Sequence, residues 1–331
     1  MNPKKFPMPT GMLLKTDDEE KFLPFQNPTT YKDITVELKP NGEALRVYVT
    51  ADTTPVQRVT LYFADPLHEK AQVLGGVWER GYGDYEWRGY IPHRVMPWYF
   101  FLQSGNKTEA FGVHTQPAAM CWWTAESTGY SVYLDVRCGG LGVRLNGRTL
   151  CAAELCRAEY EDADGFTAMG EFFSVLSPNP ILPKSPVYGA NNWYHAYGHA
   201  TEDDVLREAK ALAELTEGLA NRPWFIIDDC WQIDRADNYN GGPWRAGNKG
   251  FPDMPDLAKK LRESGIQPGI WVRLLWDHSE SIPASWRSKR DPEYLDPSVP
   301  EVLDHIIVGH RNLLQGQHET ANLPDEDQPK K

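Results

Sequence analysis

The chain has 331 residues, of which 41% are hydrophobic, so it can bury one or two cores and is not disordered as a whole. Its formal net charge of -12 at pH 7 argues against nucleic acid and anionic membranes as partners, because both attract clustered lysine and arginine. A neutral ligand fits this charge better.

The N-terminal region shows no targeting signal. Lys4 and Lys5 are not followed by an apolar run of roughly 7–15 residues, so no secretory signal peptide is predicted. No stretch approaches the roughly 18–20 apolar residues of a membrane helix. The five cysteines are odd in number and scattered, which is typical of reduced thiols. We therefore expect a cytoplasmic protein.

Hydrophobic and polar residues alternate with period two between residues 31 and 180. Asn146-Gly147 lies between two short runs and indicates a hairpin, because both residues tolerate positive φ. Evenly spaced strands without a helical period predict an antiparallel β-sandwich. Its inner faces should bury six residues in particular: Leu45, Val47, Val59, Leu61, Val132 and Leu134.

A proline-rich segment, SPNPILPKSP at 177–186, separates two kinds of pattern, since proline cannot continue a strand ladder. We assign residues 31–182 to the sandwich and residues 1–30 to an N-terminal extension. Residues 183–315 form a second domain. The polar residues 316–331 are predicted to be a disordered tail.

Short apolar strands alternate with capped helices in the second domain. Strands are expected to begin at Val187-Tyr188-Gly189 and to span Trp224–Ile227 and Ile266–Leu275. Helices are expected after the caps Thr201 with Asp204, Asp253, and Ser298 with Glu301. The Trp224–Ile227 strand is apolar throughout, as expected of a strand buried on both faces. This order predicts a parallel α/β domain. A (β/α)8 (TIM) barrel needs about 250 residues, so only its first three βα units fit here.

Ligands of parallel α/β domains bind at the carboxyl ends of the strands. Trp193 follows the first predicted strand, Asp228 and Asp229 follow the second, and Trp271 lies in the third. Two adjacent carboxylates repel each other unless a partner uses them. A sugar can use them, because carboxylates accept hydrogen bonds from vicinal hydroxyls and tryptophan faces cover the apolar side of a pyranose.

Structural explanations of the same residues stay open. The Asp228-Asp229 pair can cap a helix and form a salt bridge, and the two tryptophans can pack in a core. A metal site is disfavoured, because His195 and His199 lie beside a glycine without an acidic partner at helical spacing. No P-loop occurs and no Gly-x-Gly-x-x-Gly follows a strand, so no cofactor is expected.

Three segments make the sequence recognisable: YGANNWYHAYG (188–198), WFIIDDCWQ (224–232) and FPDMPDLAKKLRESGIQPGIWV (251–272). In this order, and at successive strand ends, they resemble the α-galactosidase clan of glycoside hydrolases. The resemblance covers most of residues 120–315. It implies an N-terminal β-sandwich followed by a (β/α)8 barrel.

The resemblance also implies roles for individual residues. Asp228 and Asp229 match the acidic pair that binds the hydroxyls of galactose, and Trp193 and Trp271 match aromatic walls of the sugar site. In that clan the nucleophilic aspartate lies in a Lys-x-Asp-type motif on the fourth strand, and a later strand carries the acid/base aspartate. No such strand follows Leu314. We therefore expect a sugar-binding shell and no catalytic residue.

The polar tail does not replace the missing pair. Asp325 and Asp327 lie among polar residues and prolines, whereas a retaining glycosidase needs two carboxyls about 5–5.5 Å apart on rigid supports.

Three interpretations remain. The first is a truncated retaining α-galactosidase, inactive alone, whose barrel is completed by a separate chain or in a homo-oligomer. The second is a non-catalytic carbohydrate-binding protein or pseudoenzyme. The third is a relative that acts on another sugar. In the first two, the expected ligand is galactose or an α-galactoside.

Overall fold

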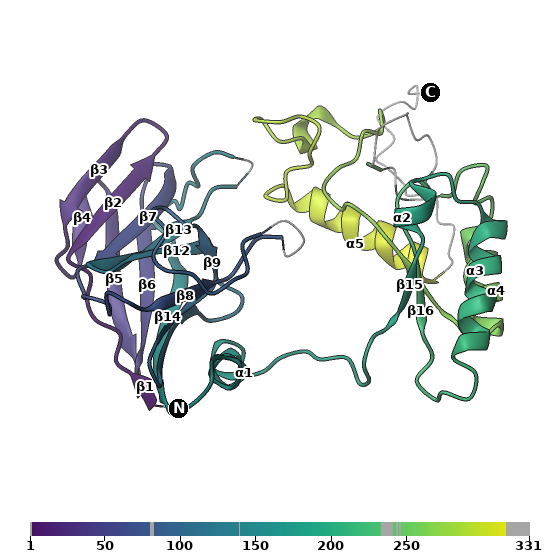
Figure 1. Ribbon diagram of the computed structural model, residues 1–331. Coiled ribbons are helices and arrows are strands. Elements are labelled where there is room, and N and C mark those ends of the chain that lie inside the picture. The colour runs from purple at the N-terminus through teal and green to yellow at the C-terminus, as the bar shows by residue number, and fades with distance from the viewer. Residues whose placement is uncertain are drawn as a thin grey trace, which may run out of the picture. The chain divides into compact units, whose positions relative to one another are not determined.

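The computed structural model describes residues 2–79, 83–138, 140–232, 241–242, 244 and 246–315, with side chains up to residue 307. The chain divides into two compact units, Met1–Pro180 and Ile181–Lys331 (Figure 1). The sequence predicted this boundary between residues 182 and 183. The predicted disordered tail, 316–331, lies outside the described residues.

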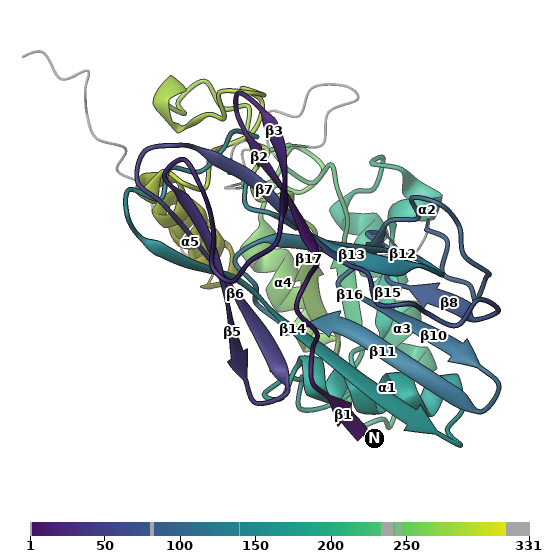
Figure 2. The same cartoon turned by 90° about the vertical axis from the view of Figure 1, so that its left-hand side faces the viewer.

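Two antiparallel sheets make up most of the first unit, as the period-two pattern predicted. Within the described residues, one sheet has the order β4 (Thr29–Tyr31), β5 (Ile34–Asn41), β6 (Ala44–Ala51), β14 (Thr149–Glu161), β11 (Lys107–Val113), β10 (Tyr99–Ser104), β8 (Gln72–Gly75), with β1 (Asn2–Lys4) also pairing with β14. The other has the order β3 (Glu20–Pro24), β2 (Gly11–Thr16), β7 (Val56–Phe63), β13 (Gly129–Asp135), β12 (Met120–Glu126), β9 (Met96–Pro97). Figure 2 shows β14, β11 and β10 lying side by side.

One hydrophobic core joins the two sheets into a sandwich. Along β6 the buried residues alternate with partly exposed ones, which is how a strand covered on one face is built. The six residues predicted to face inward are each at most 1% exposed and belong to this core: Leu45, Val47, Val59, Leu61, Val132 and Leu134. The sandwich prediction is therefore confirmed.

The predicted N-terminal extension is wrong, because residues 2–24 are part of both sheets. β2 lies between β3 and β7, and its Met12 and Leu14 are buried in the sandwich core. β1 pairs with β14 of the other sheet. Prolines and charged residues surround these short strands. The sequence pattern there was therefore not distinguished from that of a loop.

The helix α1 (Gly165–Leu176) was not predicted. Asp164 caps its N-terminus by accepting a hydrogen bond from the Thr167 amide at 2.9 Å. Its Phe172 packs with Phe101 and Ala158, which lie on the opposite face of the sheet from the sandwich core. The helix therefore covers the outer face of the larger sheet, and the unit has a third layer there.

The second unit contains a parallel sheet of β15 (Gly189–Asn191), β16 (Trp224–Ile227) and β17 (Gln267–Ile270) in that order. The helices α3 (Glu202–Leu215) and α4 (Met254–Glu263) follow β15 and β16, and they pack with Phe225 and Ile227 in one core. Trp224 and Ile226, which alternate with these residues along β16, are only partly buried. The sequence predicted that β16 is buried on both faces. This prediction is wrong, because one face of the strand is only partly buried.

Local capping explains where these helices begin. The predicted capping box of Thr201 and Asp204 is present, and Asp253 caps α4. The predicted box of Ser298 and Glu301 does not match α5 (Pro300–Gln315), because this helix begins two residues after Ser298, so that Val299 is the residue directly before it. The Ser298 hydroxyl donates to Asp296 Oδ1 at 2.7 Å. The third strand is also shorter than predicted, ending at Ile270.

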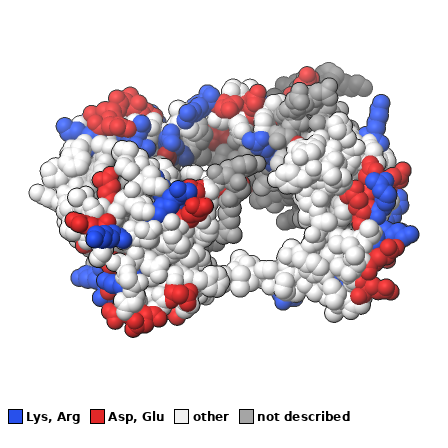
Figure 3. All heavy atoms as spheres, viewed as in Figure 1, with Lys and Arg blue, Asp and Glu red and all other residues white. Residues whose placement is uncertain are grey.

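Surface charges of both signs are mixed. On the face of each unit seen in Figure 3, lysine and arginine lie among aspartate and glutamate. Within the described residues, no helix has the length and apolar character needed to cross a membrane.

Candidate functional site

The carboxyl ends of the three parallel strands bring the predicted site residues to one edge of the sheet. Asn191 is in register with Ile226, and Ile227 with Ile270, so the residues that follow each strand emerge on the same side. The one-turn helix α2 (Trp193–Ala196) begins directly after β15, and Figure 1 shows it at this end of the strands.

Asp228 is held in place by its neighbours on β15. Its Oδ2 accepts a hydrogen bond from the Asn191 amide, and its backbone N–H donates to Asn192 Oδ1 at 2.9 Å. Its Oδ1 accepts from the backbone N–H of Asp229 at 2.7 Å. These bonds fix the carboxylate, and among the residues that the structure describes Asp228 forms no ion pair.

Asp229 is more deeply placed, with 8% of its surface exposed. Its Oδ1 accepts from the backbone N–H of Cys230 at 2.6 Å and from Gln232 Nε2 at 2.9 Å. Among the described residues, its Oδ2 accepts no hydrogen bond. A hydroxyl group at this oxygen would therefore complete the carboxylate's hydrogen bonding.

Trp193 is half-buried and follows the asparagine pair directly. Its backbone N–H donates to Asn191 Oδ1 at 2.8 Å, so the same side chain orients both Trp193 and Asp228. The next turn is tied to α3 by His195 Nε2, which lies 2.8 Å from Glu208 Oε1. In the structure His195 therefore pairs with Glu208. Among the described residues, no group of three His, Cys, Asp or Glu side chains gathers as in a metal site.

Trp271 lies immediately after β17 and packs among other tryptophans. Its N–H donates to Ile227 O at 2.8 Å, and its carbonyl accepts from Trp231 Nε1 at 2.9 Å. Its ring meets that of Trp244 edge to face at 5.8 Å. Trp271 thus combines core packing with a partly exposed surface.

Asn191, Asn192 and Gln232 hold the candidate site in place and were missed by the sequence interpretation. Each holds a carboxylate or the peptide beside it, and Asn192 and Gln232 are buried. Their positions in the sequence pointed to the site, since both asparagines directly precede Trp193 and the glutamine ends the DDCWQ segment (228–232). The bonds depend on the register of β15 against β16, which the sequence alone did not give.

A further buried carboxylate, Asp277, lies in the loop after β17. Burial alone would raise its pKa, but hydrogen bonding from His305 and Ser279 outweighs this and lowers the pKa below the usual value. Ser279 Oγ donates to Asp277 Oδ1 at 2.6 Å, and His305 Nε2 lies 3.9 Å from Oδ2. This group ties the loop to α5.

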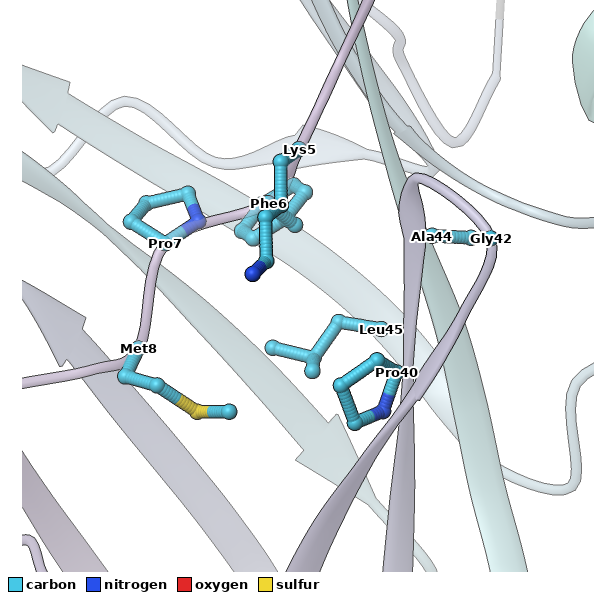
Figure 4. Close-up of a pocket in the computed structure, with 8 residues that line it drawn as sticks. All are labelled: Lys5, Phe6, Pro7, Met8, Pro40, Gly42, Ala44 and Leu45. Carbon is cyan, nitrogen blue, oxygen red and sulfur yellow. The ribbon is translucent and has the colours of Figure 1, made fainter.

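The first unit contains a pocket of about 310 Å³ between the Lys5–Met8 segment and the turn that joins β5 and β6. Figure 4 shows Phe6, Met8 and Leu45 around it. Lys5 is the one ionisable side chain in its lining, and no carboxylate faces it. The strand ends of the second unit therefore remain the candidate site.

No protein-family model matches the chain. A search of curated proteins finds α-galactosidase AgaA of Geobacillus stearothermophilus, 31% identical over 139 residues, which cover 38% of this chain and 18% of that protein. α-Galactosidase A of Cellvibrio japonicus is 32% identical over 118 residues, covering 35% and 27% respectively. The chain is similar to α-galactosidases. The predicted resemblance to α-galactosidases is therefore confirmed.

Solved α-galactosidases share the fold as well. The GH36 α-galactosidase AgaB from Geobacillus stearothermophilus superposes with a TM-score of 0.53 at 16% identity, covering 94% of this chain and 53% of that one. A variant of AgaA in complex with stachyose gives a TM-score of 0.55 at 17% identity, covering 94% and 54%. The chain thus spans about half the length of these α-galactosidases.

Proposed function

We propose that this chain binds the terminal galactose of an α-galactoside through Asp228 and Asp229, with Trp193 and Trp271 as the aromatic walls. The observation that carries the proposal is the buried Asp229, whose Oδ1 is fixed by Cys230 and Gln232 while its Oδ2 accepts no hydrogen bond from any described residue. A sugar hydroxyl is the neutral donor that fits such an oxygen.

We propose further that the parallel sheet is the beginning of a (β/α)8 barrel. The order β15, α3, β16, α4, β17 supports this, as does the similarity to GH36 α-galactosidases, of which the chain spans about half. Further strands of such a barrel would pair beyond β17. A strand added at β17 would satisfy its outer backbone groups.

Hydrolysis is not part of this proposal. The residues that bind hydroxyls lie on the first three strands, whereas a Lys-x-Asp-type motif does not occur after Leu314. Asp325 and Asp327 fall outside the described residues. Acid/base assistance contributes about 10²–10⁴-fold and a nucleophile opens the covalent route, so turnover of an aryl α-galactoside by these 331 residues should be undetectable.

The test is a calorimetric titration of the 331-residue chain with galactose. Each charged hydrogen bond contributes about 1.5–3 kcal/mol before ordering costs, so we expect millimolar affinity. Asp228→Asn with Asp229→Asn should abolish it. Asp203→Asn, on the exposed start of α3, removes charge without touching the site and should leave it intact. Equal binding by the double variant and the wild type would refute the site.

A further inference from the structure

A pocket of the first unit lies apart from the site described above. Its volume is about 310 Å³, and pockets that bind small molecules measure about 300–1,000 Å³. It lies between the Lys5–Met8 segment, which joins β1 to β2, and the turn that joins β5 to β6. We call it the sandwich pocket. Eight residues line it: Lys5, Phe6, Pro7, Met8, Pro40, Gly42, Ala44 and Leu45.

The floor of the sandwich pocket is part of the folded core. Phe6 and Leu45 are buried, and both belong to the core between the two sheets. The ring of Phe6 lies 5.3 Å from that of Phe63, and the Phe6 backbone N–H donates to Glu43 O at 3.1 Å. This bond ties the segment to the turn opposite it. The pocket therefore has its shape before a ligand binds, which reduces the entropy lost on binding.

The rim of the pocket exposes apolar surface to water. Met8 is 44% exposed, and Pro40 is exposed beside it in the lining. A hydrocarbon group placed between these two side chains would remove apolar surface from water, which is favourable. A sugar does not match this lining, because none of the eight side chains carries an oxygen that accepts a hydrogen bond.

Lys5 supplies the one charge of the lining. The residue is exposed, and Figure 4 shows its side chain extending toward Leu45. Among the described residues Lys5 forms no ion pair, whereas the adjacent Lys4 pairs with Glu159 at 2.9 Å. An ammonium group beside apolar surface attracts an anion more strongly than one surrounded by water, because the local dielectric constant is lower. The pocket thus combines a positive group at its mouth with an apolar floor.

We infer that the sandwich pocket binds a small monocarboxylate with an apolar body. The carboxylate pairs with Lys5 at the mouth, and the hydrocarbon part lies between Met8 and Pro40. A phosphate or a dicarboxylate would leave part of its charge without a partner, because no arginine lines the pocket and one lysine is a single point charge. This ligand class differs from the neutral sugar proposed for the strand ends, so the two proposals are independent.

The experiment uses benzoate as the probe and benzamide, which has the same ring and no charge, as its control. Both are titrated into the full chain at low salt, where charge pairing is least screened. The amide signals of Lys5–Met8 and Gly42–Leu45 are followed by nuclear magnetic resonance. We expect benzoate to bind at millimolar concentration and to shift the signals of both segments. Benzamide should bind about threefold more weakly, as expected from the loss of one partly exposed ion pair.

Matched variants separate the charge from the apolar wall. Lys5→Gln should lower the benzoate affinity to that of benzamide. Lys4→Gln removes the same charge from the adjacent residue and should leave the benzoate affinity unchanged, since Glu159 keeps Lys107 as a partner at 3.3 Å. Met8→Ala should weaken both probes by a similar factor of about three, because it removes apolar surface that both contact.

Three results would overturn the inference: signals of the two segments that do not shift, equal affinities of the wild type for benzoate and benzamide, or an unchanged benzoate affinity in Lys5→Gln. Galactose added in excess should leave benzoate binding unchanged. Displacement of benzoate by galactose would place the probe at the strand ends and would also overturn the inference. A chain that binds benzoate and not galactose would overturn the proposed function alone.

Discussion

The two units of this chain are stabilised in different ways. The sandwich encloses its core between two sheets, and large aromatic residues such as Trp123 and Phe100 are completely buried there. The parallel sheet of the second unit has helices packed against Phe225 and Ile227, while Trp224 and Ile226 are only partly buried. Its strand ends depend instead on a network of polar side chains. The comparison teaches that apolar burial fixes the first unit and specific hydrogen bonds fix the site of the second.

The largest effect should come from breaking the sandwich core. Trp123 is completely buried and lies 5.6 Å, ring to ring, from Phe100. Trp123→Ala should lower the free energy of unfolding of the first unit by about 3–5 kcal/mol, because it removes the largest buried side chain and leaves a cavity. Denaturant unfolding followed by circular dichroism measures the loss.

If the two units are stabilised separately, the Trp123→Ala molecules that stay folded should bind galactose with an unchanged dissociation constant. Trp78→Ala, at a ring that is 50% exposed, provides the control and should cost far less. A Trp123→Ala variant of unchanged stability would show that burial in the sandwich core does not stabilise the first unit.

The next effect concerns the polar network of the second unit. Asn191→Ala removes the donor to Asp228 and the acceptor of the Trp193 N–H, which leaves two groups of the site without their partner. The galactose dissociation constant should rise about tenfold, which corresponds to about 1.4 kcal/mol. Asn221→Ala serves as the control. Asn221 bonds Pro186 O at 2.8 Å on the opposite edge of the sheet, so its loss should not affect binding.

A smaller effect is expected from a polar tie in the sandwich. Asp33 Oδ2 accepts hydrogen bonds from the N–H groups of Thr53 and Thr54 at 2.6 and 2.9 Å. Bonds from the Thr54 hydroxyl and these two amides lower the pKa of Asp33 well below its usual value. Asp33→Ala should therefore destabilise the first unit at pH 7 by about 1 kcal/mol.

The stabilisation by Asp33 should depend on pH in a defined direction. Because the pKa is lowered on folding, the contribution is fully present above the usual carboxyl pKa of about 3.9 and is lost as the pH falls below it. The difference in unfolding free energy between wild type and Asp33→Ala should therefore shrink below about pH 4. A difference that grows on acidification would show that another group dominates.

The sequence predicted those parts of the molecule that local periodicity determines. The inner strands of the sandwich follow from alternation alone, and the position of Asp228 and Asp229 follows from a short apolar strand before them. β2 was missed because its apolar residues Met12, Leu13 and Leu14 are consecutive and do not alternate with polar ones. The helix α1 was missed although Ala168, Phe172 and Leu176 recur every four residues, because exposed apolar residues such as Phe166 obscure this period.

Non-local contacts could not be predicted from local patterns. Asn191 and Asn192 act on Asp228 only because β15 and β16 are parallel and in a particular register. The asparagine side chains had several possible partners, and the tertiary structure selected one. The box at Ser298 is a local error instead, because α5 begins at Pro300 and Val299 directly precedes it.

The smallest expected effect tests backbone strain within the site itself. Cys230 follows the two aspartates, is buried, and has a φ of 81°, where glycine is the favoured residue. We expect Cys230→Gly to be more stable than Cys230→Ala by about 1 kcal/mol, because both lose the sulfur but only alanine keeps the strain. Ala209 of α3 is equally buried in a helix, where Ala209→Gly should instead cost about 1 kcal/mol. Thermal unfolding of these variants decides the sign. If the alanine variant is the more stable one, the left-handed conformation is not what limits stability at this position, and the hydrogen bonds of the Cys230 N–H to Asp229 and Gln232 contribute more than the backbone strain costs.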